Sequence, residues 1–383
     1  MKRGCLFNTA IIITGLACLY GFIETLHQWE PTRIIWKRWK TNDPYLYEEL
    51  DPQYLKTNPA DVITIHTPAD AIRVRDALIG AIWGDEGLPL GIQPERIDRD
   101  IPLGEDSGHK NLGGKFYAHM DNLAGIDRVH VTVDKEYASK VFHFRPKRGN
   151  NRLVIYQNGY GGTGTFHDRK ELIAEMISEG YAVMALNLPN LGENSVRKRY
   201  LPRFGWYQMN NSWRLLDIVD RPMRFWFQPV VGVVSYAKEA YAYDNIDMIG
   251  FSAGGFVAIV AAAADERIRR SYPVAGTYPM YLRSGNEQSP RPHYYAPMIH
   301  AANFLEMFAL ATFGSNRRQL QIFNRFDRCC YSGVKGKHYE KAVQDTVKAI
   351  GGGGFRVLLD ETHARHMVSD FALQAIFTDM DAP

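Results

Sequence analysis

The chain has 383 residues, of which 45% are hydrophobic, and its formal net charge is +3. A chain of this length and composition can bury one large core or two smaller ones. The small net charge gives no general attraction to nucleic acid, and we expect no nucleic-acid partner. The four cysteines are too few for a disulfide framework, and adjacent cysteines seldom bridge each other; they are Cys5, Cys18, Cys329 and Cys330.

Residues 1–23 are typical of a membrane anchor or signal segment. Met1, Lys2 and Arg3 form a basic start, and residues 5–23 form an apolar run of about 19 residues, which could just span a bilayer. The run fits a retained anchor, a cleaved signal or a lipidated Cys18, so we expect a membrane-anchored or exported protein with its catalytic part on the extracytoplasmic side. Tryptophans then alternate with basic residues over positions 29–40, a mixture that suits a membrane interface or an ordinary amphipathic linker.

Residues 24–127 are predicted to be a tether and N-terminal extension. Up to about residue 60 the segment is rich in Pro, Tyr, Trp and charge, which indicates weak structure. Residues 69–82 have the apolar spacing of a helix, and the sequence GDEGLP at 84–89 ends it. Residues 90–127 show little periodicity.

A larger domain is predicted over residues 128–383. Val129, Val131 and Val133 alternate with polar residues, and positions 138–144 alternate again, as in a hairpin. Strands and helices then follow in turn, which predicts an α/β fold with a mostly parallel sheet and helices on both faces. The predicted strands are 153–156, 182–186, 246–251, 268–274, 320–323 and 355–359, and the predicted helices are 169–179, 223–241, 257–264, 339–350 and 368–377.

Two inserts, at residues 194–221 and 278–318, interrupt this alternation. Both are rich in aromatic residues and both follow predicted strand ends. Active groups in parallel sheets gather at the carboxyl ends of strands. We therefore expect the inserts to form a cap that lines a substrate pocket and excludes water.

The most informative segment is the G-F-S-A-G sequence at residues 250–254, which lies between a predicted strand and a predicted helix. Gly250 and Gly254 allow a tight turn that lifts the Ser252 hydroxyl above the sheet, as in a nucleophile elbow. The following helix points backbone N–H groups and its positive dipole end at this turn.

A serine hydroxyl becomes a good nucleophile when a base takes its proton and a carboxylate holds that base in the right tautomer. Asp327 and His366 follow the predicted strands 320–323 and 355–359, so both reach the same sheet edge as Ser252. His363 lies three residues before His366 and is the alternative base. The two histidines with Asp360 and Glu361 lack a third ligand cluster, so we expect no metal site.

With these residues, positions 128–380 resemble the α/β-hydrolase superfamily, in particular its bacterial secreted or membrane-tethered, esterase-like members. The resemblance implies an α/β-hydrolase fold with an oxyanion hole formed by the backbone N–H groups of Ala253 and Tyr160. The family loop usually begins His-Gly, whereas here it begins Asn158-Gly159.

The resemblance also implies a serine hydrolase that cleaves a small-molecule or lipid-like carboxylic ester through an acyl-enzyme on Ser252, without a cofactor. An amidase, peptidase or acyltransferase would use the same triad. A different alternative is a catalytically silent, membrane-tethered binding module. Cys329 and Cys330 are expected to be buried against the loop that carries Asp327 rather than to form a reactive pair.

Overall fold

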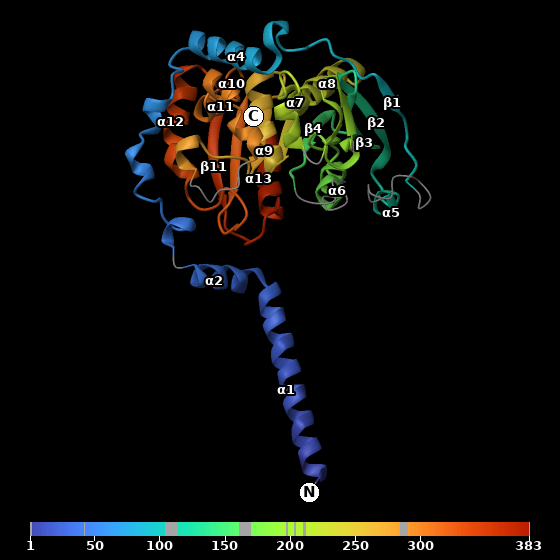
Figure 1. Cartoon of the computed structure of the whole chain (residues 1–383), viewed down its shortest axis with the longest axis vertical. Coiled ribbons are helices and arrows are strands. Elements are labelled where there is room, and N and C mark those ends of the chain that lie inside the picture. Colours follow the sequence, from blue (N-terminus) through green and yellow to red (C-terminus); the bar gives the residue numbers. More distant parts are fainter. Residues whose placement is uncertain are drawn as a thin grey trace.

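A computed structural model of the chain describes residues 2–41, 43–103, 114–160, 170–196, 198–202, 204–209, 212–283 and 290–382, and the side chains of residues 2–13, 27 and 212 lie outside this description. The described residues form a nine-stranded sheet of order β1-β2-β3-β5-β4-β8-β9-β10-β11 (Figure 1). Its strands are β1 (Arg96–Asp98), β2 (Leu123–Asp134), β3 (Tyr137–Pro146), β4 (Arg152–Gln157), β5 (Ala182–Leu186), β8 (Asn245–Phe251), β9 (Arg270–Val274), β10 (Arg318–Asn324) and β11 (Gly354–Asp360).

The strands from β5 to β11 pair in parallel, whereas β1, β2, β3 and β5 pair antiparallel at one edge. The predicted hairpin is the β2–β3 pair. The predicted fold class, a mostly parallel sheet preceded by a hairpin, is therefore confirmed.

Helices cover both faces of this sheet because alternate residues of its strands enter two separate cores. In β4, Leu153 and Ile155 belong to one core, and Val154 and Tyr156 belong to the other. The first core includes side chains of α4 (Pro68–Trp83), α8 (Arg224–Ala240), α9 (Ala253–Ala264), α10 (Ala296–Ala301), α11 (Phe304–Leu310) and α12 (Gly336–Ala349). The second core includes side chains of α5 (Gly114–Tyr117), α6 (Lys170–Ser178) and α13 (Asp370–Asp381).

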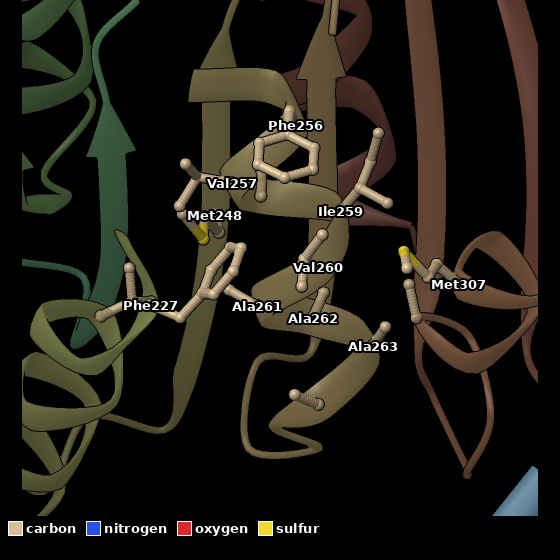
Figure 2. Close-up of a cluster of buried hydrophobic side chains, with 14 of the residues drawn as sticks. Phe227, Met248, Phe256, Val257, Ile259, Val260, Ala261, Ala262, Ala263 and Met307 are labelled. Carbon is tan, nitrogen blue, oxygen red and sulfur yellow. The ribbon is translucent and has the colours of Figure 1, made fainter. Parts of the chain in front are cut away.

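Helix α9, which begins directly after Ser252, is buried along its whole length. Its apolar side chains pack between Phe227 of α8 and Met307 of α11 and lie over Met248 of β8 (Figure 2). Burial of each medium-sized apolar side chain contributes about 1.5–3 kcal/mol. The start of α9 is therefore fixed rigidly relative to the end of β8.

The N-terminal third is more structured than its composition indicates. Helix α1 (Lys2–Gln28) covers the predicted anchor segment and extends away from the rest of the chain (Figure 1). Helices α2 (Glu30–Lys40) and α3 (Pro59–Val62) lie within the predicted tether. Among the described residues, no helix combines the length and the apolar character needed to cross a membrane.

The predicted boundary at residue 128 also differs from the structure. Strand β1 and the first residues of β2 lie before it but belong to the central sheet. Helix α4 packs against α10, and its apolar side chains join the first core. Thr67 begins α4 with a capping box to Asp70, as the sequence TPAD favours.

The two inserts differ from each other. The first contains a hairpin, β6 (Lys198–Leu201) and β7 (Gly205–Gln208), followed by α7 (Leu215–Ile218). The second contributes α10 and α11. Every residue of α11 is buried and its apolar residues belong to the first core, so this part is core rather than the predicted cap. Asp217 and Arg291 join the two inserts by an ion pair of 2.6 Å. Residues 197, 203, 210, 211 and 284–289 of these inserts lie outside the described residues.

Candidate active site

Ser252 lies in a strained turn between β8 and α9, with φ of 56° and ψ of −124°. A Cβ atom on Gly250 would lie 2.1 Å from the Gly254 oxygen, and one on Gly254 would lie 2.1 Å from the Gln157 oxygen. Only glycine fits both places, since real Cβ contacts are longer. A positive φ at a non-glycine residue costs energy that the packed strand and helix must offset. This is the geometry that the G-F-S-A-G sequence predicts.

The structure brings Asp327 and His366 together. Nδ1 of His366 lies 2.5 Å from Oδ2 of Asp327, which is buried, whereas the imidazole is partly exposed. The other oxygen, Oδ1, accepts a hydrogen bond of 2.7 Å from the backbone N–H of Cys329. The carboxylate is therefore held by the turn after β10, and it fixes the orientation of the imidazole.

His366 also lies beside the turn that contains Ser252. Its ring centroid is 4.6 Å from that of Phe251, the residue immediately before the serine. Asn324, at the end of β10, donates a hydrogen bond of 2.8 Å to the backbone oxygen of Met367. The ends of β8, β10 and β11 thus meet at one edge of the sheet, where the sequence placed all three residues.

The loop after β4 lies against Ser252. A Cβ atom on Gly159 would lie 2.8 Å from the Ser252 Cβ and from the Phe251 oxygen. Asn158, which stands where the family usually has histidine, is buried and accepts the Gly159 N–H through its own Oδ1 at 2.9 Å. Asn158 therefore orders this loop and leaves the backbone N–H of Tyr160 as the predicted donor.

Comparisons with known proteins agree with the fold. A sequence model of a family described as alpha/beta hydrolase fold matches residues 152–301. The fold resembles the methylesterase BT1017, at 14% identity and a TM-score of 0.59 over 88% of this chain and 69% of that one. It also resembles acetyl xylan esterase 1 from Thermoanaerobacterium sp. JW/SL YS485, at 12% identity and a TM-score of 0.50 over 83% of this chain and 95% of that one.

The chain has the α/β-hydrolase fold. No protein of curated function matches it by sequence. At these identities the structural likenesses show the fold, so the catalytic roles of individual residues stay predictions.

Within the α/β-hydrolase fold, the structure gives the two histidine candidates different surroundings. His363 is buried, and its Nε2 lies 3.1 Å from Oδ2 of Asp360 rather than near Asp327. Its Nδ1 accepts the backbone N–H of Arg365 at 3.0 Å. Both ring nitrogens of His363 are therefore used inside the loop that carries His366.

Asp360 has a structural role, which the sequence did not indicate; there it was considered only as part of a metal site that we did not expect. Its carboxylate also accepts hydrogen bonds from Thr362 and from the Ser369 hydroxyl. Burial raises the pKa of Asp360, but the hydrogen bonds from His363, Ser369 and Thr362 outweigh burial and lower this pKa to about 2. An acid at the end of a predicted strand, followed by Thr two residues on, was the available signal.

The two adjacent cysteines are more accessible than expected. Cys329 is exposed and Cys330 is half-buried, and neither forms a disulfide. Cys330 packs in part against the first core. The expectation of burial is therefore wrong for Cys329, and Cys330 is buried only in part.

Proposed function

We propose that this α/β-hydrolase-fold protein is a serine hydrolase that cleaves a carboxylic ester through an acyl-enzyme on Ser252. The observation that supports it most is the 2.5 Å contact between His366 and the buried Asp327, beside the strained serine turn. The names of the two similar structures, a methylesterase and an acetyl xylan esterase, favour an ester over an amide.

The reaction would proceed in two steps. Ser252 Oγ attacks the ester carbonyl while Nε2 of His366 takes its proton, and Asp327 stabilises the imidazolium through Nδ1. The backbone N–H groups of Ala253 and Tyr160 bind the oxyanion, each contributing about 3 kcal/mol of barrier lowering. His366 then gives the proton to the leaving alcohol, and a water molecule repeats the sequence on the acyl-enzyme.

A fluorophosphonate probe tests this proposal directly. We expect it to label the chain at Ser252, and we expect Ser252→Ala to abolish both labelling and the hydrolysis of short-chain aryl esters. Asp327→Asn should lower kcat by about 10³- to 10⁴-fold, because the imidazole then holds the wrong tautomer. Undiminished labelling of Ser252→Ala would refute the assignment, and absence of any turnover in the wild type would favour the silent binding module.

A panel of matched esters, anilides and acyl acceptors separates the esterase from the amidase, peptidase and acyltransferase alternatives. The first insert supports an aromatic wall near the oxyanion loop, because Nε1 of Trp213 donates a hydrogen bond of 2.8 Å to the Tyr160 hydroxyl. We expect acyl or aryl groups that can pack on these rings to give the lowest KM.

We also propose that α2 rests on the surface of an anionic membrane. Surface helices normally turn their apolar face inward. Helix α2 packs Ile34 inward but leaves Ile35 66% and Trp39 72% exposed. Trp36 packs beside Trp39 with ring centroids 5.1 Å apart. Basic residues flank these rings, and such a mixture favours the headgroup region.

Sedimentation with vesicles tests the membrane proposal. The full chain should sediment with phosphatidylglycerol vesicles more than with phosphatidylcholine vesicles, and salt should weaken this binding. Trp36→Ala with Trp39→Ala should reduce it strongly, whereas Trp206→Ala, which removes an equally exposed tryptophan on β7, should not. Equal sedimentation of both variants would refute a role for α2.

A further inference from the structure

Cys329, Cys330 and His366 lie together at the edge of the candidate active site. One ligand atom from each, the two Sγ atoms and a ring nitrogen, all lie within 4.8 Å of one another. Two of these residues come from the turn after β10, and the third comes from the loop after β11, so the cluster joins the two loops that also bring Asp327 and His366 together.

Two thiolates and one imidazole are the donor set that a soft divalent cation prefers. Zinc binds cysteine sulfur at about 2.3 Å and histidine nitrogen at about 2.0–2.1 Å, which places two sulfurs of a tetrahedral site about 3.8 Å apart. The three ligand atoms lie within 4.8 Å of one another, so their spacing exceeds that of a zinc site by at most about 1 Å. Rotation of the exposed Cys329 side chain can bring them closer. A water molecule would complete the fourth position.

The cysteines are reachable from solvent. A surface cavity of 310 Å³ opens on Cys329 and Cys330. Two acidic and two basic side chains line this cavity, so their charges give no net repulsion of a cation. They are Asp43, Asp51, Arg328 and Lys335. The Asp327 carboxylate lies next to the cluster as well.

We propose that Cys329, Cys330 and His366 form an inhibitory site for a thiophilic divalent cation such as Zn²⁺. On binding, the two thiols release their protons to solvent, and the cation takes both sulfurs and one ring nitrogen of His366 as ligands. Either nitrogen suffices for inhibition. Ligation through Nδ1 moves the ring proton from Nδ1 to Nε2, which breaks the hydrogen bond to Asp327 and leaves Nε2 unable to accept the serine proton. Ligation through Nε2 occupies the lone pair that would accept the serine proton.

The inhibitory part rests on the proposed hydrolase function, but the binding part does not. Binding is therefore measured first, on the untagged full chain carrying Ser252→Ala, by competition for Zn²⁺ with a fluorescent zinc indicator. We expect each chain to bind one Zn²⁺ ion tightly. Cys329→Ser, Cys330→Ser and His366→Gln should each weaken it by at least about tenfold, the loss that even outer-shell substitutions produce.

Cys18→Ser is the matched control, because Cys18 is an exposed cysteine on α1, which extends away from the sheet (Figure 1). It should leave the affinity unchanged. Co²⁺ gives a second readout that does not depend on affinity: the full chain should show a thiolate charge-transfer band and tetrahedral ligand-field bands, both lost in Cys329→Ser with Cys330→Ser. Circular dichroism confirms that each variant is folded. Unchanged Zn²⁺ affinity in that double variant would overturn the site.

The wild-type chain then tests inhibition. Zn²⁺ should abolish aryl-ester hydrolysis with the dissociation constant measured for binding, and a chelator should restore the activity. The activity of each cysteine variant with Zn²⁺ is compared with that variant's own metal-free rate. Inhibition of these variants should require at least about tenfold more Zn²⁺ than inhibition of the wild type. If the chain binds Zn²⁺ as described but hydrolyses no ester, the proposed function fails while the site stands. Full hydrolysis with the site occupied would overturn the inhibitory role.

Discussion

The ammonium group of Lys37 lies 3.3 Å from the backbone oxygen of Phe326, the residue immediately before Asp327. The same ammonium donates to the backbone oxygen of Ala364, two residues before His366. Glu30, on the same face of α2, accepts the Ala364 N–H at 3.1 Å. Helix α2 therefore fastens the two loops on which the proposed acid and base depend.

We expect Lys37→Met and Glu30→Gln to lower kcat by about tenfold with little change in KM, because small misplacements of catalytic groups are costly while substrate contacts stay the same. Steady-state kinetics on an aryl ester measure this. Lys40→Met removes the same charge from an exposed position of α2 and should have no effect. If Lys37→Met and Glu30→Gln have the same kcat as the Lys40→Met control, α2 does not position the site.

The different surroundings of the two histidines give a matched pair of variants. His366→Gln should abolish turnover, with kcat lowered by about 10³-fold or more. His363→Gln should keep kcat within about tenfold but destabilise the fold by about 1–3 kcal/mol, since it disturbs the buried hydrogen bonds around Asp360. Urea unfolding and kinetics on both variants separate these effects, and a reversed pattern would make His363 the base.

The serine turn could be predicted from sequence because it is local. Glycines at two fixed positions, a strand before and a helix after are all read within a dozen residues, and Asp327 and His366 follow from chain order once the fold is known. The choice between His363 and His366 depends on Asp360, whose hydrogen bonds only the folded loop shows.

The sequence could not predict contacts between distant segments. Residues of α2 have the composition of a linker, and their role appears only when Lys37 meets the loops after β10 and β11. The second insert was misread for a related reason: aromatic and aliphatic residues look alike in a cap and in a core, and α11 is held in the core by packing against α9 and α12.

The buried His143 on β3 makes the free energy of unfolding depend on pH. Burial lowers its pKa to about 3, with Asp127 opposing and Arg145 and Arg99 reinforcing that shift. The unfolded chain takes up a proton near pH 6.5 and the folded chain does not, so stability present above about pH 6.5 is lost progressively as pH falls toward 3.

This loss amounts to about 1.4 kcal/mol per pH unit for one such proton. His143→Gln, which can still bond the Tyr243 hydroxyl, should reduce the slope of unfolding free energy against pH by about one proton between pH 6 and 4. Urea unfolding at several pH values measures the slope. The control is His119→Gln, which removes an exposed histidine. Equal slopes in the wild type and His143→Gln would contradict this assignment.

The close approach of Gly159 to the serine turn makes Gly159→Ala a sharp test of the oxyanion loop. The added methyl group would lie 2.8 Å from Ser252 Cβ and from a backbone oxygen, neither of which can move without disturbing the turn, so the loop must retreat. Retreat carries the Tyr160 N–H away from the oxyanion, and loss of one such donor costs about 10²- to 10³-fold in kcat. Gly80→Ala adds the same methyl group in open space on α4 and should leave kcat unchanged. Because Asp327 and His366 lie on other loops, their bond should survive in Gly159→Ala, and an unchanged kcat there would mean that the second oxyanion donor comes from elsewhere.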